Sequence, residues 1–109
     1  MHELSIAESV VHAVLERTGD RPVAAVRIRV GRLSGVVPDA LQFCFELATS
    51  GTPLEGAGLE IDEPAGSAHC RGCGRDFALE DLLPLCECGS ADVEVLAGRE
   101  LDLMSVEVV

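Results

Sequence analysis

A quartet of cysteines within nineteen residues is the feature that most constrains this chain. The cysteines form two pairs, Cys70-Arg-Gly-Cys73 and Cys86-Glu-Cys88, and a glycine follows each pair. Cys-x-x-Cys lets two thiolates face one metal ion, and the glycine after it relieves crowding where the backbone folds back to offer N–H groups to sulfur. Twelve residues separate the pairs, which is enough for a short hairpin to bring them together. The spacing predicts a zinc-ribbon-like site whose four thiolates hold a structural zinc ion with no open position.

Two alternatives to this ligand set stay open at this point. The second pair is one residue shorter than a usual zinc knuckle, and His69 and Glu87 lie close enough in the chain to replace a thiolate. Cys70 and Cys73 can also be read as a redox dithiol, which needs a strand before the motif and a helix after it. The residues that follow Cys73 indicate a turn into a hairpin, and this favours zinc.

Length and charge limit the classes of protein to which the chain can belong. Its 109 residues suit one domain, or one domain with a small insert. The formal charge of −11 argues against nucleic-acid binding, because phosphate contacts need a cationic face. No apolar run approaches the ~18 residues of a membrane span, so we expect no membrane association. The N-terminus does not resemble a signal peptide, and five cysteines without an export signal favour metal ligation in the reducing cytoplasm.

Apolar residues at helical spacing predict two helices. The first is expected to begin at Ser5, where Ser5 and Glu8 fit a capping box, and to end near Gly19. The second is expected to be capped by Asp39, with Gln42 three residues further on. Its predicted inner face consists of Leu41, Cys44, Phe45 and Ala48. Cys44 is therefore interpreted as a core residue and not as a fifth ligand.

Alternating apolar residues predict three strands around these helices, at residues 26–30, at 59–62 and from about residue 100 to the end. In the last strand Leu101 and Leu103 keep one phase and Val106 and Val108 the other, so a bulge near Met104 would return both pairs to one face. We predict an α+β fold with two helices on a small mixed three-stranded sheet. The domains are expected to be residues 1–66 plus 99–109, and an inserted zinc-binding, ribbon-like subdomain at 67–98.

The N-terminus is the remaining candidate for chemistry, since the chain has neither a P-loop nor a nucleophile elbow and we expect no enzyme. The Met1 amine, the His2 amide nitrogen and imidazole, and the Glu3 carboxylate can form a compact set of four donors. Such a set favours square-planar Ni²⁺ or Cu²⁺ once amide nitrogen is deprotonated.

The chain resembles the HypA/HybF family of nickel metallochaperones over essentially its whole length. The matching stretches are the initial Met-His-Glu-Leu-Ser-Ile, the cysteine quartet, and residues 30–35, 41–46 and 98–101. The resemblance implies that Met1, His2 and Glu3 form the nickel site and that the four cysteines hold zinc. It also implies delivery of Ni²⁺ for maturation of [NiFe]-hydrogenase, and in some organisms urease. The implied partners are a HypB-type GTPase and the hydrogenase large subunit, and a weak homodimer is compatible with the sequence.

Two other functions are distinguishable from nickel delivery by experiment. A zinc-ribbon adaptor between proteins would carry the Met-His-Glu start incidentally and would bind no stoichiometric nickel. A thiol oxidoreductase would use Cys70 and Cys73 as free thiols and not as zinc ligands.

Overall fold

The computed structural model describes residues 2–81 and 83–109, and its contacts divide the chain into two compact units. The helical unit contains residues 2–28, Val36–Ile61 and Asp102–Val109, and the cysteine unit contains Arg29–Gly35 and Asp62–Leu101. The elements are α1 (His2–Thr18), β1 (Val23–Val30), α2 (Pro38–Thr49), β2 (Gly58–Asp62), β3 (Ser67–Cys70), β4 (Asp76–Ala78), β5 (Val93–Ala97) and β6 (Leu101–Val108). These two helices and two small sheets confirm the predicted α+β class.

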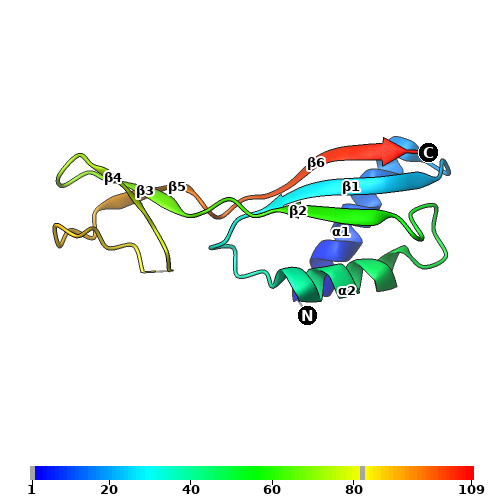
Figure 1. Ribbon diagram of the computed structural model, residues 1–109, viewed down its shortest axis with the longest axis horizontal. Coiled ribbons are helices and arrows are strands. Elements are labelled where there is room, and N and C mark those ends of the chain that lie inside the picture. The colour runs from blue at the N-terminus through cyan, green and yellow to red at the C-terminus, as the bar shows by residue number, and fades with distance from the viewer. Residues whose placement is uncertain (1, 82) are drawn as a thin grey trace. The chain divides into compact units, whose positions relative to one another are not determined.

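The helical unit is built on a three-stranded sheet in the order β2-β1-β6, so the last strand of the chain pairs with the first (Figure 1). Alternate residues of β1 are buried, as the sequence predicted: Val26, Ile28 and Val30 lie inside while Arg27 is exposed. Helices α1 and α2 pack against each other. Their buried side chains include Ala7, Val11, Val14, Leu41 and Phe45.

The first helix begins at His2, so the predicted start at Ser5 is wrong. The apolar stripe extends back to Ile6, which is buried, and this favours another helical turn ahead of it. Glu3 lies in that first turn, where an acidic side chain complements the positive end of the helix dipole. His2 and Glu3 are therefore part of the helix.

The second helix begins at Pro38, so the predicted cap by Asp39 is also wrong. Proline suits the first helical position, because its missing N–H would have no partner there. Asp39 lies inside the first turn, and the Gln42 amide donates to the backbone carbonyl of Leu59, 2.8 Å away. The predicted inner face is confirmed: Leu41 and Phe45 are buried, and Cys44 and Ala48 are half-buried.

The cysteine unit has its own three-stranded sheet, in the order β4-β3-β5, with β3 antiparallel to both neighbours. Leu33, Ala68 and Leu79 form its small apolar cluster, against which Phe77 and Val95 pack. Gly98 is required beside this cluster, because it has a φ of 112° and a Cβ there would lie 2.7 Å from the Cα of Gly66. The loop that carries Leu33 therefore belongs with the cysteines and not with the helices.

The predicted domain boundaries, residues 1–66 plus 99–109 and residues 67–98, stay a prediction about which parts fold independently. Along the described part of the chain, no helix has the length and apolar character needed to cross a membrane.

Leu101 was expected to face the core but is 47% exposed, whereas Leu103, Val106 and Val108 are half-buried. The spacing of these three follows the predicted change of phase along β6.

Candidate metal centre

The four cysteine sulfurs of the quartet gather in one place, at one end of the β4-β3-β5 sheet. Cys70 ends β3, Cys73 lies in the turn toward β4, and Cys86 and Cys88 lie in the loop that precedes β5. Their sulfur atoms all lie within 4.8 Å of one another. Two pairs across the cluster, Cys70 with Cys88 and Cys73 with Cys86, have Sγ–Sγ distances of 3.7 Å. A tetrahedron with Zn–S bonds of ~2.3 Å has edges of about 3.8 Å, so the donor set fits zinc.

The loop after Cys70 has the hydrogen bonds of a zinc knuckle. The Cys73 N–H donates to the Cys70 sulfur at 3.4 Å, and the Gly74 N–H donates to the Cys70 carbonyl at 2.8 Å. Gly74 has a φ of 77°, a conformation that side chains other than glycine rarely adopt. The glycine after the first pair thus closes the loop so that both sulfurs turn to the same side.

The shorter second pair reaches the cluster through a tighter turn. The Gly89 N–H donates to the Cys86 carbonyl at 2.9 Å, and the Cys86 N–H donates to the Ser90 carbonyl at 3.0 Å. This turn places Cys86 at its first position and Cys88 at its third, so one intervening residue is enough to direct both sulfurs inward. Cys86 is buried and Cys88 is exposed, just as Cys70 is buried and Cys73 is exposed.

The two cysteine loops are also joined to each other by contacts that need no metal. A Cβ at Gly72 would lie 3.0 Å from the Ser90 hydroxyl oxygen, so glycine permits the loops to approach this closely. The Arg71 N–H donates to the Asp92 carbonyl at 2.9 Å, and the Arg71 guanidinium contacts the Asp92 carboxylate at 3.0 Å. These contacts hold the two pairs near each other before an ion binds.

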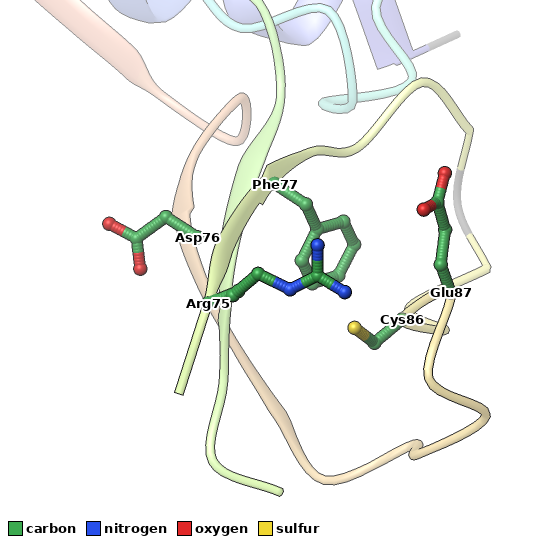
Figure 2. Close-up of a pocket in the computed structure, with 5 residues that line it drawn as sticks. All are labelled: Arg75, Asp76, Phe77, Cys86 and Glu87. Atoms are coloured by element: carbon green, nitrogen blue, oxygen red, sulfur yellow. The ribbon is translucent and has the colours of Figure 1, made fainter. Parts of the chain in front are cut away.

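Arg75 supplies positive charge beside the cluster, and the sequence reasoning missed it. Its guanidinium lines a small pocket of about 110 Å³ with Phe77, Cys86 and Glu87, and Figure 2 shows these side chains facing the same space while Asp76 points away. A hydrogen bond to Cys73 raises the pKa of Arg75, and the charges of Cys86 and Glu87 raise it further. Four thiolates on one Zn²⁺ carry a net charge of about −2, part of which this guanidinium offsets. The sequence could have indicated this role, because Arg75 directly follows Gly74, the glycine of the first cysteine pair.

Two thiols of the cluster, Cys73 and Cys86, have pKa values shifted in opposite directions. A hydrogen bond from the Arg75 backbone N–H is the largest cause that lowers the pKa of Cys73, which falls to about 6. The backbone N–H of Cys88 lowers the pKa of Cys86, but burial and hydrogen bonds with the thiols of Cys88, Cys73 and Cys70 together raise it to about 11. An ion that enters the metal-free cluster at neutral pH therefore meets a thiolate at Cys73 and must displace a proton from Cys86.

The alternative ligands considered from the sequence lie outside this cluster. His69 and Asp76 are paired across β3 and β4, and the imidazole Nδ1 lies 2.6 Å from the Asp76 carboxylate. Glu87 lines the pocket with Arg75 and is not in the group of side chains able to share one ion. Cys44 lies in the helical unit. The first cysteine pair lies in the turn of a hairpin, between β3 and β4. A thioredoxin-like dithiol needs a helix after the motif, and here a strand follows it.

At the predicted nickel site, Met1 lies outside the described residues, whereas His2 and Glu3 form the first turn of α1. His2 is exposed and Glu3 is half-buried. A carboxylate oxygen of Glu3 accepts the Val37 N–H at 3.1 Å, where α2 begins. This hydrogen bond is the largest cause that lowers the pKa of Glu3, so the carboxylate is charged at neutral pH. The contact joins residues 34 apart in sequence, and no local pattern could have predicted it.

The fold and the cluster together define a small α+β protein with a four-cysteine centre suited to zinc. The chain belongs to the HypA family, because residues 1–108 match the family model described as "Hydrogenase/urease nickel incorporation, metallochaperone, hypA". This is a family of maturation factors for nickel enzymes.

Relatives named as hydrogenase maturation factor HypA cover almost the whole chain. The one from Geotalea uraniireducens is 46% identical and the alignment covers 99% of both chains. The one from Nostoc sp. is 44% identical over 99% of this chain and 96% of its own length. Among solved structures, the solution structure of the nickel metallochaperone HypA from Helicobacter pylori has a similar fold. Its TM-score is 0.66 at 21% identity, and the match covers 98% of this chain and 97% of that one.

Proposed function

We propose that this chain binds Ni²⁺ at its N-terminus and delivers it for maturation of [NiFe]-hydrogenase, with urease as a further candidate recipient. The family match carries this proposal, since it begins at residue 1 and so includes the Met-His-Glu start together with the cysteine quartet. The proposed nickel ligands are the Met1 amine, the His2 amide and imidazole, and the Glu3 carboxylate. Nickel is the cargo of the protein and not a resident cofactor.

The first turn of α1 supports a metal site at these residues. The first N–H groups of a helix have no carbonyl four residues earlier, so the His2 amide is not engaged in the helix ladder. The exposed His2 side chain is accessible to an incoming ion. A helix N-terminus disfavours a cation, and the charged Glu3 carboxylate offsets that effect. Its bond to Val37 occupies one carboxylate oxygen and ties the site to the start of α2.

Zinc is proposed as a resident structural ion on Cys70, Cys73, Cys86 and Cys88. Four thiolates leave no open coordination position, so this centre is suited to holding the fold of the cysteine unit and not to passing on its ion. The proposed partners are a HypB-type GTPase and the hydrogenase large subunit. We assign no catalytic residues, and we place the protein in the cytoplasm.

Nickel titration of untagged protein, followed by visible absorption and calorimetry, tests the proposal. One Ni²⁺ should bind per chain, and His2→Ala should abolish stoichiometric binding because it removes the neutral imidazole. An N-terminal extension should weaken binding nearly as much, since it converts the amine into an amide. Affinity should fall as the pH falls, because amine, imidazole and amide must lose protons to bind.

His12→Ala is the matched control, because His12 is also an exposed α1 histidine, and it is paired with Glu16 at 2.7 Å. It should leave nickel binding unchanged. If His2→Ala binds nickel as tightly as the unaltered chain, the N-terminal site is wrong. A chain that binds no stoichiometric nickel but keeps its zinc would instead support the zinc-ribbon adaptor.

A further inference from the structure

The proposed zinc centre has a side that solvent can reach. Cys70 and Cys86 are buried, whereas Cys73 and Cys88 are exposed. Four thiolates on one Zn²⁺ carry a net charge of about −2, and a thiolate is the form of cysteine that reacts with electrophiles and with other metals. Attack on the centre from solvent is therefore expected at Cys73 or at Cys88, and each such attack would help to release the ion.

Arg75 is bonded twice to one of these exposed sulfurs. Its backbone N–H and its guanidinium each donate a hydrogen bond to Cys73. The negative charges of Cys86 and Glu87 also act on the guanidinium. Figure 2 shows the Arg75 side chain directed toward Cys86 and Glu87 across the pocket that these residues line together with Phe77. The guanidinium therefore has a defined place beside the cluster, where it faces sulfur and an acidic side chain.

A second arginine in the same stretch of chain is used differently. Arg71 lies between Cys70 and Cys73 in sequence, and its guanidinium contacts the Asp92 carboxylate at 3.0 Å. The charge of Arg71 is thus paired with a carboxylate in the contact that joins the two cysteine loops. Proximity in sequence to the cysteines is therefore not enough to place a guanidinium against sulfur, and the position of Arg75 at the start of the β3–β4 return is what does so.

A donor and a positive charge beside a thiolate change how fast that thiolate reacts. Groups that stabilise the negative charge on sulfur lower its nucleophilicity, and hydrogen bonds from a charged donor are stronger than those from a neutral one. We propose that the Arg75 guanidinium slows the loss of zinc by shielding the Cys73 thiolate from electrophiles and competing metals. This inference rests on the proposed zinc ion and is independent of the proposed nickel site.

Transfer of zinc from the purified chain to a chromophoric chelator tests the rate of zinc loss. Arg75→Gln keeps the backbone N–H and removes only the guanidinium, and it should speed the transfer about tenfold, as changes next to metal ligands do. Arg99→Gln removes the same charge and is the matched control. Cys70 pairs with Val93 and Ser67 with Ala97, so Arg99 follows the end of β5 that lies away from the cysteines. This control should transfer zinc at the unaltered rate.

Alkylation of the zinc-loaded chain separates an effect of charge from a loosened fold. Neutral iodoacetamide and anionic iodoacetate both form an S–C bond to the thiolate as iodide leaves. In Arg75→Gln, Cys73 should react faster with iodoacetamide, and the ratio of the iodoacetate rate to the iodoacetamide rate should fall because the attraction for an anion is lost. Arg75→Lys keeps the charge and should keep this ratio. Mass spectrometry of the modified peptides makes the exposed Cys88 an internal control, whose rates should change less.

Four results would overturn the role of Arg75. The first two are unchanged zinc transfer in Arg75→Gln and an unchanged ratio of the two alkylation rates at Cys73. The third is an equal acceleration of Cys73 and Cys88 with both reagents, which would indicate a loosened cysteine unit. The fourth is a ratio in Arg75→Lys as low as in Arg75→Gln, since charge would then not be the cause. Failure of the proposed zinc site would be distinguished by metal analysis, because the unaltered chain would then contain no zinc.

Discussion

The helical unit and the cysteine unit are held together in different ways. The helical unit buries large aliphatic side chains from both helices and its sheet, among them Val14, Val26, Ile28 and Leu41, each at most 1% exposed. Among the described residues of the cysteine unit, the apolar cluster consists of Leu33, Ala68 and Leu79, with Phe77 and Val95 packed against it, beside the buried Cys70 and Cys86. Burial of apolar surface can account for the first unit, but small units with so little core usually need a metal or disulfides.

This difference separates two roles of metal in one short chain. Zinc is expected to replace the missing core of the cysteine unit and so to act as part of its structure. Nickel is expected to bind on the surface of a unit whose core does not depend on it. Each metal can therefore be removed with a different consequence, and the following experiments test that contrast in order of decreasing effect.

Loss of zinc should have the largest effect and should be confined to the cysteine unit. Cys73→Ser should abolish the intense visible bands that Co²⁺ gives on four thiolates, because it removes one of the four ligands. The variant should also unfold the cysteine unit, since structural zinc contributes roughly 10–16 kcal/mol of coupled folding in small domains. Amide hydrogen exchange should then become fast in β3, β4 and β5 while α1 and α2 stay protected. Cys44→Ser should keep the cobalt spectrum, and its loss in that variant would mean that the ligand set is misassigned.

Removal of residues 101–109 should destabilise the helical unit and leave the zinc site of the cysteine unit intact. The truncation removes an edge strand whose Leu103, Val106 and Val108 are half-buried, a loss of about 2–5 kcal/mol before hydrogen bonds with β1 are counted. Because small domains have stabilities of about 5–15 kcal/mol, the helical unit should lose its cooperative melt. The cobalt spectrum should persist. A truncated chain that still melts cooperatively would refute the discontinuous helical domain.

Matched leucine truncations compare the two cores directly. Leu41→Ala should lower the free energy of unfolding of the helical unit by about 2–5 kcal/mol, since Leu41 is fully buried. Leu33→Ala should leave that transition unchanged but speed the transfer of zinc to a chromophoric chelator. Equal effects of the two variants on zinc transfer would mean that the cores are not independent.

The smallest effect is expected from the Glu3 carboxylate. Its pKa is lowered in the folded chain by the Val37 N–H, so the contact stabilises the fold above the ordinary glutamate pKa. That stability is lost as the pH falls through the lowered pKa. In metal-free protein the melting temperature should decrease slightly less between pH 6 and pH 3 for Glu3→Gln than for the unaltered chain. The control Glu8→Gln should show the same decrease as the unaltered chain. An identical acid profile for Glu3→Gln and the unaltered chain would remove this role from Glu3.

The sequence by itself determined the features that depend on local spacing. Apolar residues at intervals of two, three and four positions identified both helices and the strands of the larger sheet. Two cysteine pairs with a glycine after each identified the four sulfurs that come together. The same locality explains the two errors at the helix starts, because capping patterns near Ser5 and Asp39 indicate where a helix can begin. They do not show that burial of Ile6 and the fixed φ of Pro38 favour other starts.

Only the tertiary structure decided which distant groups meet. Glu3 contacts Val37 across 34 positions, and Arg75 shares a pocket with Cys86 and Glu87 because β4 and the second cysteine loop face the same space. Leu33 lies in the core of the cysteine unit although its neighbours in sequence lead into α2. Such contacts depend on chain reversal and on which apolar surfaces pack together. The free energy that selects them is distributed over the whole core, so no single short stretch of sequence contains it.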